Sequence, residues 1–343
     1  MPFRDESEAG WPPSSGQGVL VRTGRAMASA ITVQVPGRPA RGRHGSPAFG
    51  RRSLERTVDR ALGQFHSVER ACSRFTPDSA LARANRRPGR WHLAPEPLYA
   101  ALREARGAYA GTSGLFDPRV HDRLVELGYD RSFHLILSEG CPPRSADGSL
   151  EAGPQPVADW RPRFVAGLRL VNLGGRRIDL GGIGKGMALA RAAALLSRST
   201  RHFLVDAGGD LYAAGSPGPT AGWRIGVESP SGEEGHVAVL ELSDRAVATS
   251  SVRVRQWNKD GRRVHHLIDP RTGEPGGHGL ASVTVVHPDP VTAETRSKVL
   301  FLAGPGAIGA VADRLGLAVL WVDASGSTGL SSAMAPFVTW LRS

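Results

Sequence analysis

Lysine is nearly missing from this chain of 343 residues. Only three of the 43 basic residues are lysines, namely Lys185, Lys259 and Lys298, and the others are arginines. The arginines are scattered along the whole sequence, and no block of them alternates with aromatic residues. The net charge of +11 therefore indicates a composition biased toward arginine, and we expect no nucleic-acid partner.

Cysteine is scarce too. The chain has only Cys72 and Cys141, and neither has a second cysteine at the spacing of a metal-binding pair, which excludes metal–thiolate sites. Two free thiols in a reducing cytosol are the simplest interpretation, and one disulfide is the alternative.

Long apolar runs are also lacking. No stretch of about 18 apolar residues is present, so we expect no stable membrane insertion. The first residues are acidic and then rich in proline, serine and glycine, without the basic start or apolar stretch of a signal peptide. We expect a disordered tail over residues 1–18, a single domain over residues 19–343 and a location in the cytoplasm.

The apolar spacing predicts an α+β fold with a largely antiparallel or mixed sheet flanked by helices. Predicted helices cover residues 53–75, 95–112, 185–198 and 293–304, and residues 76–85 are predicted to be a turn that leads to another short helical segment. Predicted strands lie within residues 19–36, 168–172, 176–180, 202–215, 223–229, 237–242, 246–251, 264–273, 281–286 and 318–326. Residues 37–50 and 137–162 are rich in loop-forming residues and are predicted to be loops.

The segment IDLGGIGKGMALARAA, residues 178–193, places four glycines around Lys185 just before an Ala/Leu-rich helix. Its spacing does not fit the nucleotide P-loop, because Asp179 stands where that motif needs glycine, and it does not fit the dinucleotide fingerprint. Glycines before a helix still favour an anion, which backbone N–H groups and the helix N-terminus can bind. A tightly packed strand-to-helix turn without a ligand is the alternative.

Two of the three lysines occupy motif positions, Lys185 and Lys298. The compact ammonium group of lysine fits a crowded phosphate site that the planar guanidinium of arginine does not fit as well. Retention of lysine here, in a chain that otherwise uses arginine, favours a phosphate-binding role.

Six further segments join the glycine motif: SRFTPDSALARAN (73–85), GLFDPRV (114–120), VDAGGDL (205–211), AVATSS (246–251), HHLIDPRTGEP (265–275) and TAETRSKVLFLAG (292–304). In order and spacing they resemble the flavin transferase (ApbE) family, from about residue 19 to residue 340. The resemblance implies an α+β fold that binds FAD and Mg²⁺ and transfers FMN from FAD to a Ser/Thr hydroxyl of an acceptor protein, releasing AMP. Hydrolysis of FAD to FMN and AMP, and flavin binding without turnover, are the alternatives. The oligomeric state is not predicted.

The resemblance also implies roles for individual residues. Lys185 would bind phosphate and His266 would act as the catalytic base, while the Gly184 carbonyl and Glu294 would bind the metal. The implied cofactor-binding residues are Asp117, Asp179, Lys185, Gly208, Gly209, Asp210, Thr249, Ser250, His266 and Lys298.

Several of these residues have simpler interpretations. His266 fits a strand histidine, Asp117 and Gly208–Gly209 fit turns, and Thr249 and Ser250 fit helix caps. The residues Asp269-Pro270-Arg271-Thr272-Gly273 make a good turn by themselves.

The chain departs from the family pattern at the predicted metal site. The family commonly has Asp and Thr where this chain has Glu294 and Lys298. Lysine does not ligate a metal while it is charged, so its ammonium would take part of the cation's place or pair with Glu294 one helical turn earlier.

Overall fold

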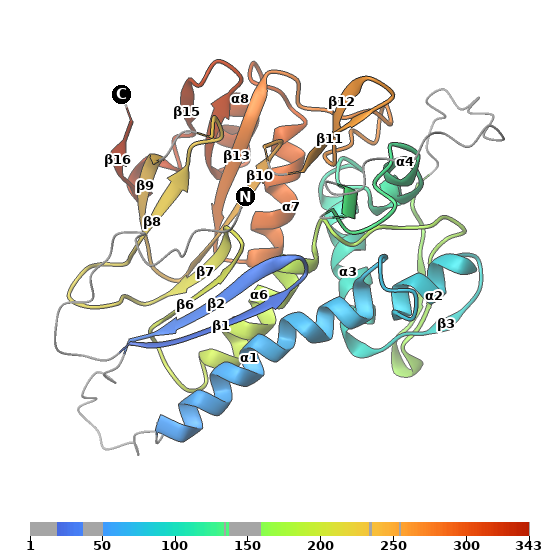
Figure 1. Cartoon of the computed structure of the whole chain (residues 1–343), viewed down its shortest axis with the longest axis horizontal. Coiled ribbons are helices and arrows are strands. Elements are labelled where there is room, and N and C mark those ends of the chain that lie inside the picture. Colours follow the sequence, from blue (N-terminus) through green and yellow to red (C-terminus); the bar gives the residue numbers. More distant parts are fainter. Residues whose placement is uncertain are drawn as a thin grey trace.

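A computed structural model describes residues 19–36, 51–133, 135–136, 159–232, 235–253 and 255–342. The predicted tail over residues 1–18, the predicted loop over 37–50, Cys141 and most of the predicted loop over 137–162 lie outside these residues. Figure 1 shows the elements that the described residues form, coloured along the chain.

An eight-stranded sheet runs through the molecule in the order β1-β2-β6-β7-β10-β13-β14-β15. Its strands are β1 Leu20–Ala26, β2 Ser29–Val35, β6 Phe203–Ala207, β7 Asp210–Ala214, β10 Arg245–Ser251, β13 Leu280–His287, β14 Ala318–Asp323 and β15 Thr328–Leu330. All seven neighbouring pairs are antiparallel. The predicted α+β class with a largely antiparallel sheet is confirmed.

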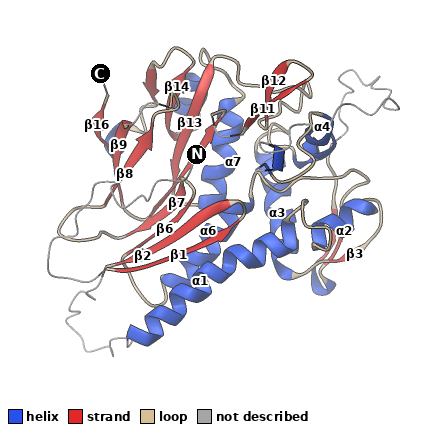
Figure 2. Cartoon of the chain, viewed as in Figure 1, coloured by secondary structure: helices blue, strands red, loops and turns tan. Residues whose placement is uncertain are grey.

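Helices cover one face of this sheet (Figures 1 and 2). They are α1 Arg51–Cys72, α3 Glu96–Gly111, α6 Gly184–Leu196, α7 Pro290–Phe301 and α8 Ile308–Arg314. In α1 the buried residues Val58, Ala61, Phe65 and Val68 recur every three or four positions and form the stripe that packs on the core. Cys72 at the end of α1 is free, and burial raises the pKa of its thiol to about 12.

A second, three-stranded sheet of order β16-β9-β8 packs on the other face. Its strands are β8 Trp223–Glu228, β9 His236–Leu242 and β16 Val338–Leu341. In β8 every second residue is buried, so Trp223, Ile225 and Val227 face the large sheet.

Shorter elements complete the chain. They are α2 Ala80–Arg86, β3 His92–Leu93, α4 His121–Glu126, β4 Arg163–Val165, β5 Leu170–Asn172, β11 Gln256–Lys259, β12 Arg262–His265 and the 3₁₀ turns Pro118–Val120, Ala166–Leu168 and Ala335–Phe337. Within the described ranges, every helix is too short or too polar to cross a lipid bilayer.

The predicted strand over residues 19–36 is instead a hairpin. Met27 and Ala28 turn the chain with φ angles of 55° and 58°, so Ala26 pairs with Ser29. Two successive left-handed residues match the twist of a two-residue hairpin, but glycine or asparagine usually fills them. Because neither glycine nor asparagine is present at positions 27 and 28, the sequence did not indicate a turn there.

Two more predicted strands differ from the structure. Residues 176–180 are not in a strand, because the side-chain amide of Asn85 bonds both the N–H and the carbonyl of Ile178 and replaces a neighbouring strand. The strand predicted over 264–273 ends at His265, where the turn around Asp269 begins.

The helices α6 and α7 cross at Gly186. A Cβ at this position would lie 2.6 Å from the carbonyl oxygen of Pro290 and 3.0 Å from the Cα of Val291. Only glycine allows the two backbones to approach this closely. The crossing brings the first turn of α6, which carries Lys185, against the helix that carries Glu294 and Lys298.

Candidate active site

The first turn of α6 connects three elements through Lys185. The Lys185 Nζ lies 2.6 Å from Asp210 Oδ2 on β7, and the Thr249 N–H on β10 donates to Asp210 Oδ1 at 3.0 Å. Burial alone would raise the pKa of Asp210, but the ammonium groups of Lys185 and Lys298 outweigh it and hold that pKa below its ordinary value. Asp210 is therefore an ionised carboxylate that fixes the position of Lys185.

Glu294 and Lys298 form a second ion pair one turn apart on α7. The Lys298 Nζ donates to Glu294 Oε1 at 3.2 Å and to the Glu294 backbone carbonyl at 3.2 Å. The other carboxylate oxygen, Oε2, accepts a hydrogen bond from the Gly186 N–H at 2.7 Å. Glu294 is buried, with 1% of its side chain exposed, and both of its carboxylate oxygens are bonded.

The glycine loop before α6 lies against Lys298. A Cβ at Gly182 would lie 3.4 Å from the Cδ and Cε of Lys298 and 3.2 Å from the ring of Phe116. The Lys298 side chain thus passes Gly182. Gly182 also lies against Phe116, the residue that precedes Asp117. In this way the segments around residues 116, 182 and 298 meet, although they lie far apart in the sequence.

His266 follows directly after β12 and is half-buried. Its Nδ1 lies 3.3 Å from the Arg255 carbonyl, which can only accept, so Nδ1 carries the proton and Nε2 is left as an acceptor. Burial is the main cause that lowers the pKa of His266 well below 6.5, and the charges of Arg255 and Lys298 lower it further. The imidazole is therefore neutral at pH 7.

Gly208 and Gly209 turn the chain between β6 and β7 with φ angles of 69° and 92°. The interpretation as a hairpin turn is confirmed, and the Gly209 N–H donates to Asp206 Oδ1 at 3.0 Å. A Cβ at Gly208 would lie 2.9 Å from Ser29 Oγ, and one at Gly184 would lie 2.8 Å from the Met27 methyl group. The β1–β2 turn therefore contacts both the β6–β7 turn and the start of α6.

Thr249 and Ser250 lie within β10, so the alternative that they cap a helix is wrong. Thr249 Oγ1 pairs with Thr284 Oγ1 at 2.9 Å, and Ser250 Oγ pairs with Ser297 Oγ at 2.8 Å. Ser250 is buried, and its bond attaches the sheet to α7 one position before Lys298.

Asp179 holds a buried arginine. The Arg74 Nε lies 2.5 Å from Asp179 Oδ2, and the Gly181 N–H donates to Asp179 Oδ1 at 2.5 Å. The Arg74 guanidinium lies over the rings of Phe75 and Tyr129, 4.1 Å and 4.7 Å from their centroids. Its Nε and Nη2 are buried and have no hydrogen bond within the described residues, so the close contact of Nε with Asp179 is an ion pair.

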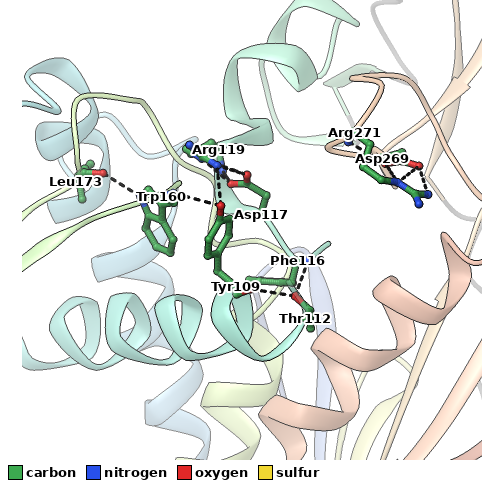
Figure 3. A network of polar contacts seen from close by, with 9 residues as sticks. All are labelled: Tyr109, Thr112, Phe116, Asp117, Arg119, Trp160, Leu173, Asp269 and Arg271. Atoms are coloured by element: carbon green, nitrogen blue, oxygen red, sulfur yellow. Dashed lines mark hydrogen bonds and ion pairs between the residues drawn. The ribbon is translucent and has the colours of Figure 1, made fainter. Parts of the chain in front are cut away.

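Asp117 and Asp269 each begin an Asp-Pro-Arg turn, and Figure 3 shows both. In each turn the arginine two residues later binds its aspartate through Nε and Nη2, with Nη2 at 2.7 Å in the first and 2.6 Å in the second. Arg119 is 9% exposed and also donates to Tyr109, whereas Arg271 is 61% exposed. Arg119 is therefore held by both Asp117 and Tyr109, and the turn interpretation of both aspartates is confirmed.

The metal implied by the resemblance fits this donor set poorly. Mg²⁺ requires six oxygen ligands in near-ideal octahedral geometry. Glu294 already uses one oxygen for Gly186 and the other for the Lys298 ammonium, which repels a second cation. Nowhere in the described ranges do three His, Cys, Asp or Glu side chains form a group that could hold a metal. Glu294 therefore fits a divalent cation poorly, and a role of the Gly184 carbonyl in binding a metal stays a prediction.

The structure brings most of the predicted residues to one place. Lys185, Asp210 and Thr249 touch directly, Glu294 and Lys298 join them across the helix crossing, and His266 lies within electrostatic reach of Lys298. Asp117 and Asp179 lie on the far side of the glycine loop, bound by arginines.

Sequence reasoning missed Arg74 and Arg255. Arg74 lies inside the segment 73–85, and Arg255 supplies the carbonyl that orients His266. Arginine is too common in this chain for either one to stand out from composition.

Comparisons with known proteins show the family of this chain. The model of the ApbE family matches residues 27–321. The FAD:protein FMN transferase of Escherichia coli K12 is 32% identical over 166 residues, which cover 48% of this chain and 45% of that protein. The FAD:protein FMN transferase of Treponema pallidum is 30% identical over 246 residues, 66% of each chain. The matched part thus spans about half of the E. coli protein.

Solved structures show the same fold. The ApbE protein of Thermotoga maritima superimposes with a TM-score of 0.75 at 25% identity, covering 93% of this chain and 99% of that one. The apo flavinyl transferase ApbE of Pseudomonas stutzeri gives a TM-score of 0.71 at 24% identity, covering 94% and 97%. The family match extends over most of the chain, and the site described above lies inside it, so the protein belongs to the ApbE family.

Proposed function

We propose that this chain transfers FMN from FAD to a Ser/Thr hydroxyl of an acceptor protein and releases AMP. The observation that carries the proposal is that Lys185, in the first turn of α6, and Lys298, packed on Gly182 of the preceding glycine loop, bring two ammonium groups to one end of this helix. The names of the relatives support FAD as the donor and a protein as the acceptor. The cytoplasmic location stays a prediction.

The reaction exchanges one phosphorus–oxygen bond for another. The acceptor oxygen bonds to the phosphorus on the riboflavin side, and the bond from that phosphorus to the bridging oxygen breaks, so AMP leaves with that oxygen. Catalysis of such a step depends on positioning and on stabilising negative charge. In this proposal the Lys185 ammonium binds the diphosphate, and the positive end of the α6 dipole favours the anion there.

His266 would take the proton of the acceptor hydroxyl. Its Nδ1–H is directed to the Arg255 carbonyl, so Nε2 has a free lone pair, and the lowered pKa keeps it neutral at pH 7. The other proposed roles are in positioning. Asp210 and Thr249 hold Lys185, Ser250 supports α7, and the Gly208–Gly209 turn borders the site.

Asp117 and Asp179 would act on the flavin side of the site. Both carboxylates are bound by arginines, so we propose that they position Arg119 and Arg74.

The test uses purified protein, FAD and an extract of the source cell freed of flavin. Transfer predicts AMP release and a fluorescent protein band that survives denaturing electrophoresis. Both signals should fall at least about a hundredfold in Lys185→Ala and His266→Ala and stay unchanged in Arg314→Ala, which removes an exposed charge from α8.

Other outcomes distinguish the alternatives. AMP released without a labelled band favours hydrolysis of FAD. Tight FAD binding without AMP favours a binding protein. If the chain neither binds nor consumes FAD, the proposal is wrong.

A further inference from the structure

The place beside Glu294, where the resemblance implies a metal ion, holds an ammonium group of the chain itself, that of Lys298. Lys298 lies on α7, and its stem passes Gly182 in the glycine loop that precedes α6. The ammonium group contacts Glu294 twice, through Oε1 and the backbone carbonyl, both at 3.2 Å. An ammonium has three donor hydrogens, so one remains for a ligand.

The surroundings of Lys298 place its charge in the active site. It lowers the pKa of Asp210 on β7 and of His266 after β12, so it acts on both the Lys185 partner and the proposed base. Its side chain is 22% exposed, whereas that of Glu294 is 1% exposed. The negative end of the pair is thus buried, and the positive end is accessible to a bound anion.

The same contacts oppose a divalent ion. A cation bound to Glu294 Oε1 would have to displace the Lys298 ammonium or share the carboxylate with it. The other oxygen, Oε2, is already bonded to the Gly186 N–H. Two like charges within a few ångströms in a partly buried site repel strongly. The Lys298 ammonium already supplies a positive charge beside Glu294, the residue that the resemblance implies as a metal ligand.

We propose that the Lys298 ammonium takes the place of a divalent cation, so that this chain binds the diphosphate of its flavin nucleotide without a metal. This inference rests on the proposed function, because it assumes that FAD is the ligand. Lys185 and Lys298 would then bind the diphosphate from the two sides of the glycine loop.

The experiment measures the affinity for FAD by fluorescence polarisation, first with excess EDTA and then over a titration with Mg²⁺. Binding of Mn²⁺ to protein without FAD is followed separately by electron paramagnetic resonance. In the wild type we expect the affinity for FAD to change less than about twofold between EDTA and Mg²⁺, and we expect no bound Mn²⁺.

A double variant, Glu294→Asp with Lys298→Thr, restores oxygen ligands at both positions. We expect its FAD affinity in EDTA to fall about tenfold to a hundredfold, and we expect Mg²⁺ to restore it. Arg314→Thr, which also removes one positive charge, should behave like the wild type. Thermal unfolding shows whether each variant is folded, and the wild-type measurements stand without any variant.

The outcomes separate the two proposals. If wild-type affinity falls at least about tenfold in EDTA and Mg²⁺ restores it, or if Mn²⁺ binds and Glu294→Gln removes it, the lysine proposal is wrong while the proposed function stands. If the wild type binds no FAD with or without Mg²⁺, both are wrong.

Discussion

Two lysine–carboxylate pairs border the same glycine loop, and they are built differently. Lys185 and Asp210 come from α6 and β7 and approach to 2.6 Å, while Lys298 and Glu294 lie one turn apart on α7 at 3.2 Å. The first pair exists only when the helix docks on the sheet, whereas the second is a local helical pair. The position of the Lys185 pair therefore depends on tertiary structure, whereas the Lys298 pair is set by the geometry of one helix.

The largest expected effect comes from breaking the tertiary pair. Asp210→Ala removes the partner of Lys185 and leaves the Thr249 N–H without its acceptor, so we expect a loss of about 3–5 kcal/mol in the free energy of unfolding. Urea denaturation measures it. Asp210→Asn keeps an acceptor for Thr249 and should lose less, and equal losses in both variants would contradict this account.

Widening the helix crossing should disturb both pairs together. Gly186→Ala places a Cβ 2.6 Å from the Pro290 carbonyl oxygen, and we expect it to cost about 1–3 kcal/mol of stability and to weaken FAD binding. The matched control is Gly107→Ala in α3, where a Cβ meets nothing within 4 Å. The control should leave stability unchanged or raise it by up to about 1 kcal/mol, measured by thermal and urea unfolding.

Neutralising the Glu294–Lys298 pair should lower the free energy of unfolding less than breaking the Lys185–Asp210 pair. Glu294→Gln can still accept from the Gly186 N–H, but its amide loses the charged bond to Lys298, so we expect a loss of about 1–2 kcal/mol in unfolding free energy. Glu55→Gln is the control, because Glu55 pairs with the exposed Arg51 at the same helical spacing. At Glu55 we expect the free energy of unfolding to fall by at most about 0.5 kcal/mol. Similar losses at both positions would contradict the argument that burial makes the Glu294 pair the stronger one.

The smallest expected effect is on the pKa of His266, which the charge of Lys298 lowers. Lys298 lowers the pKa of His266, so Lys298→Met should raise that pKa toward 6.5, while Lys185→Met should leave it nearly unchanged. Because the folded pKa lies below the ordinary value, the neutral histidine stabilises the wild type above pH 6.5, and this stability is lost as the pH falls. NMR titration of the imidazole measures the shift, and equal shifts in both variants would contradict the assignment.

The architecture was largely predictable, because most strands of the large sheet are rich in apolar residues and the helix α1 has a buried stripe at helical spacing. The failures have local causes. Met27 and Ala28 form a hairpin turn without the usual turn residues, and Asn85 satisfies the backbone of Ile178 from 93 positions away. Neither a side chain that replaces a strand nor a turn without glycine leaves a periodic signal.

The site was predictable in part. The Glu294–Lys298 pair follows from helical spacing alone. The partner of Lys185 could not be derived from spacing, because Asp210 reaches it only after β7 joins the sheet beside α6. Arg74 was missed because its role depends on burial beside Asp179, Phe75 and Tyr129, which the sequence does not encode locally.

The β1–β2 turn affects both the thermal stability of this protein and the position of the first turn of α6. An engineer seeking a more heat-resistant chain would replace Met27-Ala28 with Asn-Gly, the pair that suits two left-handed residues. The same change would remove the methyl group that lies against Gly184, together with the side chain that separates the turn from α6. Relief of backbone strain and loss of the Met27 side chain would therefore come together in this double substitution, so a gain in melting temperature here needs to be checked against ligand affinity.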